Sequence, residues 1–389
     1  MRAASYSHGN QLSLLHRGEQ FFPALIGACD AAHSEIYIET YIFALDATGM
    51  RVKAALLHAA RRGVAVHLLV DWLGTGDDTI AQLRTELEPH GVRLLTFNPW
   101  FRRGIVRMHR KIAVIDQRIA FLGGLNINDD LIADDGSAQP LPAARWDFAV
   151  SVSGPLVQTI HREVIAQWQR LGRRPLRTRL QSFREYVSQR QAWRAVQVAE
   201  AALVVRDNLR NRKAIQRALL QALGRARSSA LLVTPYFAPG RKLRKAMMHA
   251  AQRGVEVVLL IGVGQFVMQD AVAQSFYPRL VRSGVTIVEY RRTQLHGKLA
   301  VIDGEWATVG SSNFDGLSLF VNHEANIVVR DAAFATDLQR VIYAALAEGV
   351  VITQADVARL SLPRRAWNRF AYGLYRLALQ VLTLGSYTR

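Results

Sequence analysis

The sequence is poor in cysteine and in acidic residues, and it lacks a long uncharged apolar run. The single cysteine, Cys29, excludes a disulfide framework and a cysteine-based zinc site. Because Cys29 ends an apolar segment, residues 24–29, we predict a packed core thiol rather than a nucleophile. The most apolar stretch, residues 370–384, contains Arg376, so no segment reaches the roughly 18 uncharged residues of a membrane-spanning helix. The first ten residues contain no apolar core of a signal peptide.

Basic residues outnumber acidic ones, with 49 Lys+Arg against 31 Asp+Glu and a formal net charge of +18. This excess predicts an anionic partner, and charge alone does not choose between nucleic acid and an anionic membrane surface. Half of the residues are hydrophobic, which excludes a disordered chain. A length of 389 residues is sufficient for two domains or one large duplicated domain.

The chain repeats itself over a long period. Three pairs of segments match in the same order: 59–64 with 251–255, 90–95 with 283–288, and 108–116 with 295–303. Helical patterns alternate with apolar strands in both copies, which predicts βαβ units with helices on both faces of each sheet. The sequence is therefore predicted to be a tandem duplication of one α/β domain.

The repeats set the expected domain limits. We predict an N-terminal domain over residues 1–171, a basic linker over 172–199, a C-terminal domain over 200–350 and a separate tail over 351–389. Seven arginines and a single acid, Glu185, occur in the linker. It is interpreted either as a solvated basic connection or as an element that binds an anionic surface.

Each repeat carries a histidine, a lysine, an aspartate and an asparagine at the same spacing. The two sets are His109, Lys111, Asp116 and Asn126, and His296, Lys298, Asp303 and Asn313. Side chains alternate along a strand, so each histidine is predicted to face the same way as its lysine. Each aspartate, at an odd offset of seven, is predicted to end a strand or lie in a turn and to support the site indirectly. Core packing does not require a basic pair in each half, so the repetition points to chemistry.

This pattern, with Gly-Gly or Gly-Ser ahead of the asparagine, resembles the HKD signature of the phospholipase D superfamily. Segments 39–43, 107–111, 310–313 and 322–326 are similar to bacterial cardiolipin synthases, most of all to the B type, which lacks an N-terminal pair of membrane helices. The resemblance covers about residues 9–345. It implies a tandem duplication of a phospholipase D-like α/β/α sandwich with the active site between the two halves.

The resemblance also implies an activity. A phosphatidyl group would pass to phosphatidylglycerol through a phosphohistidine, with no metal and no cofactor. Family precedent makes His109 the nucleophile and His296 the general acid and then base, and groups Asp116 and Asp303 with the catalytic residues. A neutral imidazole is a good nucleophile near neutral pH, and an imidazolium can protonate a leaving alkoxide.

The phosphate needs donors on its oxygens. Lys111 and Lys298 would neutralise the non-bridging oxygens, and such charged donors act where the charge develops. Asn126 and Asn313 would add amide donors. Ser311, which replaces the glycine of the first copy, is expected to donate to a phosphate oxygen.

Two downstream acids complete the expected site. Asp147 and Glu324 occupy equivalent places if the first half has a longer loop after its asparagine, and they resemble the acids that orient the family's histidines. An acceptor on the second ring nitrogen fixes the tautomer of a histidine. Surface strand-edge carboxylates are the alternative interpretation. His323 is expected to be exposed and is given no role.

The C-terminal segment leaves two interpretations open. Trp367, Phe370, Leu374 and Leu377 follow a helical spacing, with arginines largely elsewhere on the helix. Such a helix could cap the core, or it could lie in a bilayer headgroup region. We expect the second, which predicts a peripheral protein on the cytoplasmic side of the cell membrane.

The expected partners are phospholipid substrates, namely phosphatidylglycerol and a phosphatidyl donor, and an anionic membrane surface. Three alternatives stay open at this point. The same chemistry with another acceptor would give a hydrolytic phospholipase D or a phosphatidylserine synthase. A nuclease of the superfamily would also suit the net charge of +18, but the aromatic and basic tail argues against nucleic acid. A scaffold without activity is disfavoured by two intact motifs.

Overall fold

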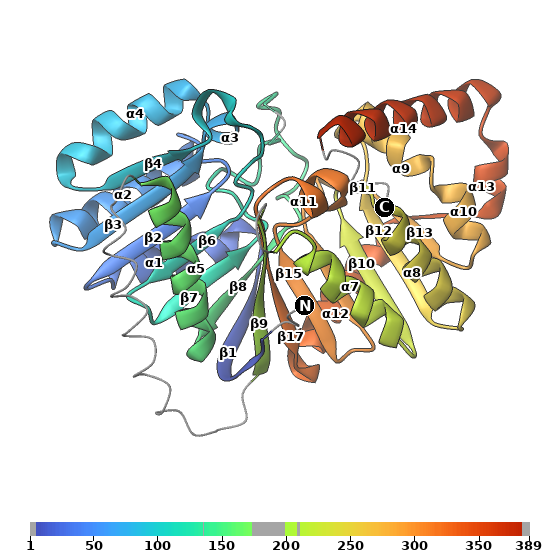
Figure 1. The fold of residues 1–389 in the computed structure, drawn as a ribbon, viewed down its shortest axis with the longest axis horizontal. Helices are drawn as coiled ribbons and strands as arrows, with labels where there is room; N and C mark the ends of the chain where they lie inside the picture. The colour runs from blue at the N-terminus through green and yellow to red at the C-terminus, as the bar shows by residue number, and fades with distance from the viewer. Residues whose placement is uncertain (1–4, 135, 173–198, 208–210, 383–389) are drawn as a thin grey trace.

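The computed structural model describes residues 5–134, 136–172, 199–207 and 211–382 (Figure 1). Its first half contains β1 (Ser7–His16), α1 (Arg17–Asp30), β2 (Glu35–Thr40), α2 (Ala47–Arg61), β3 (Ala65–Asp71), α3 (Trp72–Thr75), α4 (Asp77–Leu87), η1 (Glu88–His90), β4 (Arg93–Phe97), η2 (Pro99–Phe101), β5 (Arg102–Ile105), β6 (Ile112–Ile115), β7 (Ile119–Gly123), β8 (Phe148–Ser153) and α5 (Pro155–Leu171).

The second half repeats this order. It contains β9 (Ala199–Arg206), α7 (Ala214–Arg225), β10 (Ser229–Thr234), β11 (Phe237–Ala238), α8 (Arg241–Gln252), β12 (Glu256–Gly262), α9 (Val267–Gln274), α10 (Tyr277–Arg282), β13 (Thr286–Tyr290), β14 (Leu299–Ile302), β15 (Trp306–Gly310), β16 (Phe314–Asp315), α11 (Gly316–Phe320), β17 (Glu324–Arg330), α12 (Ala332–Ala347), β18 (Val350–Ile352), α13 (Gln354–Arg359) and α14 (Leu362–Leu382).

A single sheet of 15 strands runs through both halves. β1 and β9 pair antiparallel at its centre. Outward from β1 the order is β8, β7, β6, β2, β3 and β4, and outward from β9 it is β17, β15, β14, β10, β12, β13 and then β18. Apart from β18 at the outer edge, the strand order outward from the central pair is therefore equivalent in the two halves. This confirms the predicted duplicated α/β fold.

The core explains why the strands are apolar on both faces. One hydrophobic cluster lies between the sheet and helices α5 and α12, and it takes residues from both halves, such as Val150 and Val309. Two further clusters lie on the other face, one under α1, α2 and α4 and one under α7 to α10. A sheet covered on both faces needs near-continuous apolar strands. Cys29 is fully buried in the first-half cluster, as predicted.

The described residues bear on two of the predicted domain limits. Apart from Gly172 and Ala199, the predicted basic linker lies outside the described residues. β18 pairs with β13 in the main sheet, so the sheet of the second half extends to Ile352, two residues beyond the predicted limit. Among the helices of the described ranges, none combines the length and the apolar character that crossing a bilayer requires.

Candidate active site

Two pairs of backbone contacts join the halves at the centre of the molecule. The His109 N–H donates to the His323 carbonyl at 2.9 Å, and the His323 N–H donates to the Arg107 carbonyl at 2.8 Å. The same arrangement recurs on the other side, where the His296 N–H donates to the Trp146 carbonyl at 2.9 Å. Each signature histidine is thus tied to a residue of the opposite half, and that residue directly precedes one of the predicted acids.

The acids therefore reach the histidine of the other half. Both carboxylate oxygens of Glu324 lie 3.1 Å from Nδ1 of His109. Oδ2 of Asp147 lies 2.5 Å from Nδ1 of His296. A carboxylate only accepts hydrogen bonds, so Nδ1 carries the proton in each ring and Nε2 is left for chemistry. The sequence placed both acids near the histidines, and the structure adds that the pairs cross between the halves.

Burial sets the protonation of the two imidazoles. The His109 side chain is 13% exposed and the His296 side chain 6%. Burial lowers the pKa of His109, although the nearby Glu324 charge opposes this. Burial and the Lys298 charge lower the pKa of His296 well below its ordinary value. Both rings are therefore neutral near pH 7 before an anion binds, and each offers a free Nε2.

The two signature lysines approach the same centre. Nζ of Lys111 donates to the His109 carbonyl at 2.8 Å, and Nζ of Lys298 donates to the His296 carbonyl. Burial and the charge of Lys298 lower the pKa of Lys111 to about 7. Burial lowers the pKa of Lys298 to about 8. Two buried cations repel each other, so this site favours an anion that would neutralise them.

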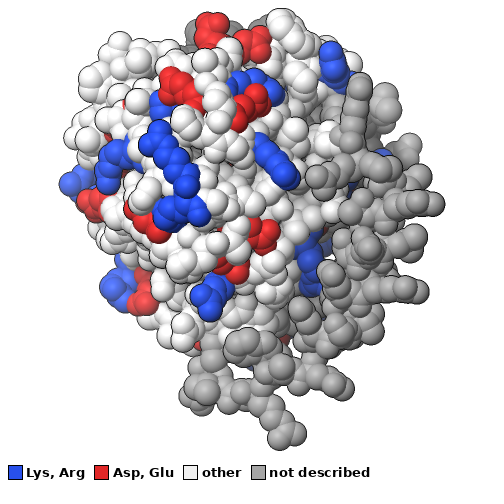
Figure 2. Space-filling model, turned by 90° about the vertical axis from the view of Figure 1, so that its left-hand side faces the viewer, with Lys and Arg blue, Asp and Glu red and all other residues white. Residues whose placement is uncertain are grey.

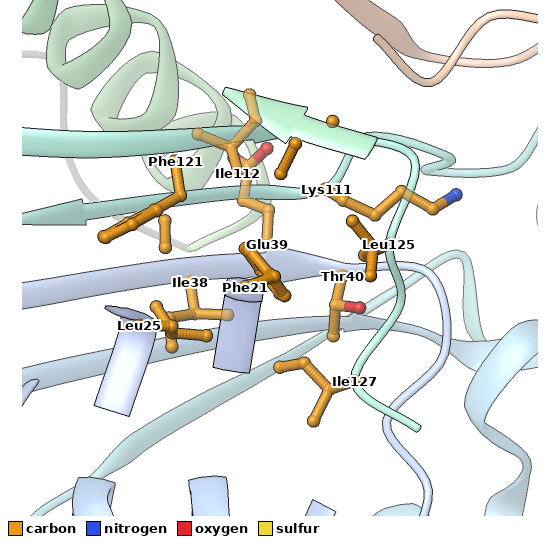
Figure 3. Close-up of a pocket in the computed structure, with 13 residues that line it drawn as sticks. Phe21, Leu25, Ile38, Glu39, Thr40, Lys111, Ile112, Phe121, Leu125 and Ile127 are labelled. Carbon is orange, nitrogen blue, oxygen red and sulfur yellow. The ribbon is translucent and has the colours of Figure 1, made fainter. Parts of the chain in front are cut away.

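Figure 3 shows how Lys111 leaves the core of the first half. Its side chain extends away from the apolar residues Phe21, Leu25 and Phe121, and its nitrogen lies at the far end. The apolar stem thus lies beside packed side chains while the ammonium reaches the histidines. The void among these residues measures about 20 Å³, which is room for one water molecule and not for a lipid headgroup.

The structure corrects the role expected for Ser311. Its hydroxyl donates to Oε2 of Glu324 at 2.5 Å and accepts from the Ala325 N–H at 3.1 Å. A hydroxyl has one proton to donate, and here the carboxylate takes it. Ser311 is fully buried and therefore holds Glu324 in place instead of reaching a phosphate.

The two asparagines remain candidates for phosphate contact. Asn126 is buried, and its Oδ1 accepts from the Ile42 N–H at 3.2 Å. Asn313 is also buried, and its side chain hydrogen-bonds Asp315 while Oδ1 has no partner among the described residues. Neither amide contacts a signature histidine in a described hydrogen bond, so their contact with a phosphate stays a prediction.

The signature aspartates lie away from the histidines. Asp116 accepts hydrogen bonds from the backbone of His33, Ser34 and Glu35 at 2.8–2.9 Å, ahead of β2. Asp303 does the same for residues 227–229, ahead of β10. A whole strand separates each aspartate from its histidine, so their grouping with the catalytic residues is corrected. The turn position predicted for them is confirmed.

His323 is not exposed, contrary to the expectation. Its ring lies 5.2 Å from that of Phe97, and burial lowers its pKa to about 3. The expectation failed because β17 begins at Glu324, and the residue before it bridges to the first half. The ring is a neutral packing element beside the site.

Sequence reasoning also missed two residues at the histidines. The Tyr41 ring lies 5.0 Å from the His109 ring, and Nζ of Lys111 lies 5.2 Å from the Tyr41 ring. Oδ2 of Asp134 lies 3.6 Å from Nε2 of His296. Asp134 belongs to the longer loop of the first half, and that length difference was the available signal.

A duplicated sheet whose two histidine–lysine pairs meet between the halves defines a phospholipase D-like protein. Residues 25–135 and 219–345 match the family model described as "Cardiolipin synthase, PLD-like domain". The chain belongs to this family.

Known proteins agree with this assignment. The chain is 38% identical to cardiolipin synthase B of Salmonella typhi, over 93% of this chain and 86% of that protein. It is 36% identical to cardiolipin synthase B of Escherichia coli (strain K12), over the same shares. A solved structure, the phosphatidylserine synthase of Haemophilus influenzae Rd KW20, is similar in fold, with a TM-score of 0.72 and 14% identity over 98% of this chain and 97% of that one.

Proposed function

We propose that the protein is a cardiolipin synthase, which transfers a phosphatidyl group from a donor phospholipid to a hydroxyl of phosphatidylglycerol. The observation that carries the proposal is the crossed arrangement of His109 with Glu324 and of His296 with Asp147, in a chain whose relatives are cardiolipin synthases. Two imidazoles with free Nε2 atoms suit an exchange of one phosphodiester for another, because one can attack while the other handles protons.

In the first step, the lone pair on Nε2 of His109 attacks the phosphorus of the donor. The bond from phosphorus to the headgroup oxygen breaks, and that oxygen takes a proton from Nε2 of His296. A phosphatidyl group is then bonded to His109, and the headgroup leaves as an alcohol. Glu324 stabilises the positive charge that the His109 ring gains, because it accepts the Nδ1 proton.

In the second step, the acceptor hydroxyl attacks the same phosphorus from the side that the headgroup left. Its proton passes to Nε2 of His296, the bond from phosphorus to His109 breaks, and the new phosphodiester departs. No outside energy source is needed, because one phosphodiester replaces another. Water has to be excluded at this stage, since water would give phosphatidic acid.

Binding of the lipid phosphate prepares the proton donor. The lowered pKa of His296 results from burial and, next, from the charge of Lys298. A phosphate anion would neutralise the two lysines and so remove part of that repulsion, which lets His296 hold a second proton. The two lysine cations thus bind the substrate phosphate, and the same binding event allows His296 to become the protonated acid.

Membrane docking is part of the proposal, and α14 carries it. The helix packs against α9, and its residues Ala371 and Leu379 are buried. Its other side exposes Trp367 at 38%, Phe370 at 61% and, further along, Leu374 and Leu377 at 45% and 58%. One face of this helix therefore covers the core, and the other stays apolar and open, which supports a docking role. An amphipathic helix with this pattern suits a headgroup region.

A second exposed apolar cluster lies in the first half, at α3 and η2. Trp100 is 68% exposed, Leu73 47% and Phe101 45%, and the Trp72 ring lies 5.3 Å from that of Trp100. In Figure 1, α3 and α14 lie along the same edge of the molecule, with α11 between them. Two apolar clusters along one edge can enter a bilayer together, which supports a peripheral position at a membrane surface. The cytoplasmic side of the cell membrane is part of the proposal and does not follow from these clusters.

The face of the first half seen in Figure 2 offers little support for nucleic acid. Figure 2 shows the outer face of the first half, where basic and acidic side chains are interspersed over a largely uncharged surface. A nuclease would need a continuous basic track for the phosphate backbone, and this face does not present one.

The experiment that tests the function uses the purified full chain and vesicles of phosphatidylglycerol. We expect cardiolipin and free glycerol in equal amounts, measured by mass spectrometry of the lipid extract. Expression in a cardiolipin-deficient bacterium should restore the lipid. Phosphatidic acid alone would indicate a hydrolytic phospholipase D, and formation of phosphatidylserine with added serine would indicate the other acceptor.

A further inference from the structure

Asp134 is the nearest carboxylate to the reactive nitrogen of His296 among the described residues. Its Oδ2 lies 3.6 Å from Nε2 of that ring, on the side opposite to the Asp147 contact. The Asp134 side chain is only 6% exposed. A buried carboxylate beside the atom that exchanges protons with the substrate needs an explanation, because burying a charge is costly.

The carboxylate is held in a defined position by the second half of the chain. Oδ1 accepts from Nε2 of Gln265 at 2.9 Å and also from Nε2 of Gln294. Oδ2 lies 3.9 Å from Nε of Arg145, beyond hydrogen-bond distance. One oxygen is thus fixed by two amide donors, and the other faces His296.

Burial opposes the charge of this group, yet His296, when protonated, and Arg145 lower the pKa of Asp134 overall. The group is therefore an anion and can only accept hydrogen bonds. A phosphate oxygen carries no proton to donate and would be repelled. An alcohol hydroxyl is the substrate group that such an acceptor attracts.

The carboxylate breaks the symmetry of the site. Asn126 and Asp147 are 21 residues apart, whereas Asn313 and Glu324 are 11 apart, and Asp134 lies in the additional loop. Among the described residues, His109 forms an ion pair with Glu324 alone. Within the part of the chain that the structure describes, a carboxylate within ion-pair distance of Nε2 is found for His296 and not for His109.

We propose that Asp134 forms an acceptor subsite, which binds a second hydroxyl of a polyol headgroup while the first hydroxyl loses its proton to His296. The proposal rests on the proposed function and names the feature of the acceptor that the site selects. The first hydroxyl donates its single proton to Nε2 of His296, and Oδ2 of Asp134 lies 3.6 Å from that nitrogen. A neighbouring hydroxyl on the next carbon then reaches Oδ2 as a donor.

The subsite also assigns the two imidazoles. An anion beside Nε2 of His296 stabilises the imidazolium that forms when the acceptor hydroxyl gives up its proton. The same anion would repel a phosphate from a bond to that nitrogen. His109 is therefore the residue that bonds to phosphorus, and His296 is the residue that moves protons. The phosphorus–oxygen bond forms as the bond to His109 breaks, and the proton stays on His296.

The test is a competition for the phosphatidyl group between two soluble alcohols. Full-length protein is incubated with phosphatidylglycerol vesicles, deuterated glycerol and 1-propanol at equal concentrations. Mass spectrometry gives the ratio of labelled phosphatidylglycerol to phosphatidylpropanol. Both products come from one intermediate, so the ratio reports the acceptor step alone. The wild type should favour glycerol, and Asp134→Asn should lower the ratio about tenfold, as loss of a charge-assisted hydrogen bond predicts.

The control is Asp130→Asn, which removes a carboxylate from the same loop. Asp130 accepts from the Gly18 N–H at 2.8 Å and has no described contact with His296, so its ratio should match the wild type. An unchanged ratio in Asp134→Asn and in Asp134→Ala would overturn the subsite. Loss of the folded state in both variants, seen by thermal melting, would assign Asp134 to loop stability and overturn it as well. A wild type that forms cardiolipin but transfers to neither alcohol would overturn the subsite, whereas a wild type that forms neither cardiolipin nor an alcohol product would refute the proposed function.

Discussion

The Glu324 carboxylate lies 3.1 Å from Nδ1 of His109, although the two residues are 215 positions apart. Asp147 makes the matching contact with His296 in the opposite direction. Each half therefore supplies an imidazole to the site and the acid that orients the imidazole of the other half. A half on its own would contain a histidine without the acid that orients it. The proposed chemistry therefore requires both copies of the duplicated domain.

Replacing the histidines tests whether they form one site. His109→Ala and His296→Ala should each lower phosphatidyl transfer by several decades, and the double variant should be little slower, because residues that act as a unit are not additive. Turnover of phosphatidylglycerol vesicles measures this. Substantial activity in either single variant would indicate two independent sites. His58→Ala, at an exposed helix position, is the control.

Gly124 tests the geometry behind His296. A Cβ added there would lie 2.2 Å from Oδ1 of Asp147, so Gly124→Ala has to displace the carboxylate that holds His296. Loss of an orienting partner costs about 10–100-fold in activity in comparable sites. Gly27→Ala, where nothing lies within 4 Å of the new carbon, should leave activity unchanged. Full activity in Gly124→Ala with an unaltered melting temperature would contradict the orienting role of Asp147.

Much of the site could be predicted from the sequence because the duplication repeats it. His109 and His296 stand at matched spacings, and the two acids follow at the start of apolar strands. A pattern along one chain reveals which residue types recur, and it does not reveal which half each contact crosses. The exchange of Glu324 and Asp147 depends on the backbone bridges at His323 and Trp146, which only the folded sheet brings together.

Other features could not be predicted by comparing the two repeats. Asp134 lies in a loop that the second half lacks, so the internal comparison could not align it. The role expected for Ser311 failed because the direction of a hydroxyl depends on its neighbours, and Glu324 is the nearest strong acceptor. Asp116 and Asp303 share the signature spacing. Each follows a four-residue strand, β6 or β14, and therefore lies at the end of that strand remote from its histidine.

The pH dependence of substrate capture follows from Lys111. Its pKa is lowered to about 7 by burial and the charge of Lys298, so the free enzyme loses this cation as pH rises from about 6 to 8. A lysine is charged below its pKa, and the anionic donor needs the charge. We expect kcat/KM to fall above pH 7, since this ratio reports the free enzyme.

The variant Lys111→Arg is the matched control, because an arginine stays charged throughout this range. Its kcat/KM should be lower but flatter between pH 6.5 and 9. The stability of the wild-type fold should rise with pH over the range in which kcat/KM falls. The unfolded chain keeps Lys111 protonated up to about pH 10.4, so it binds more protons than the folded chain above pH 7, and the melting temperature should rise with pH there. A flat kcat/KM for the wild type would contradict the role of this lysine.

Chelation tests the absence of a metal from the mechanism. The groups placed at the phosphate are the two imidazoles and the ammonium groups of Lys111 and Lys298, none of which suits a hard cation. Turnover in EDTA should therefore equal turnover in buffer with Mg²⁺, measured on the same vesicles. Abolition by EDTA and recovery with Mg²⁺ would show that the mechanism is wrong.

Docking at the membrane is tested on the exposed face of α14. Deletion of residues 363–389 would also remove the buried Ala371 and Leu379 from the core, so substitutions are the cleaner experiment. Phe370→Glu with Leu377→Glu replaces two side chains that are 61% and 58% exposed.

Each of these side chains contributes about 1.5–3 kcal/mol when it is fully buried, so the double variant should bind vesicles containing phosphatidylglycerol at least about tenfold more weakly. Cosedimentation measures the binding. High salt should weaken the wild type without abolishing its binding, because the basic residues supply only the electrostatic part.

Turnover of a soluble short-chain lipid should stay within about twofold of the wild type, since α14 contributes no residue to the histidine pair. Tyr343→Glu is the control, because Tyr343 is a 41% exposed aromatic residue of α12, and this helix lies away from the edge that α3 and α14 share in Figure 1. Equal vesicle binding by the double variant and the wild type would show that the apolar face of α14 does not enter the bilayer. The docking role would then pass to the exposed cluster around Trp100, where Trp100→Ser provides the same measurement.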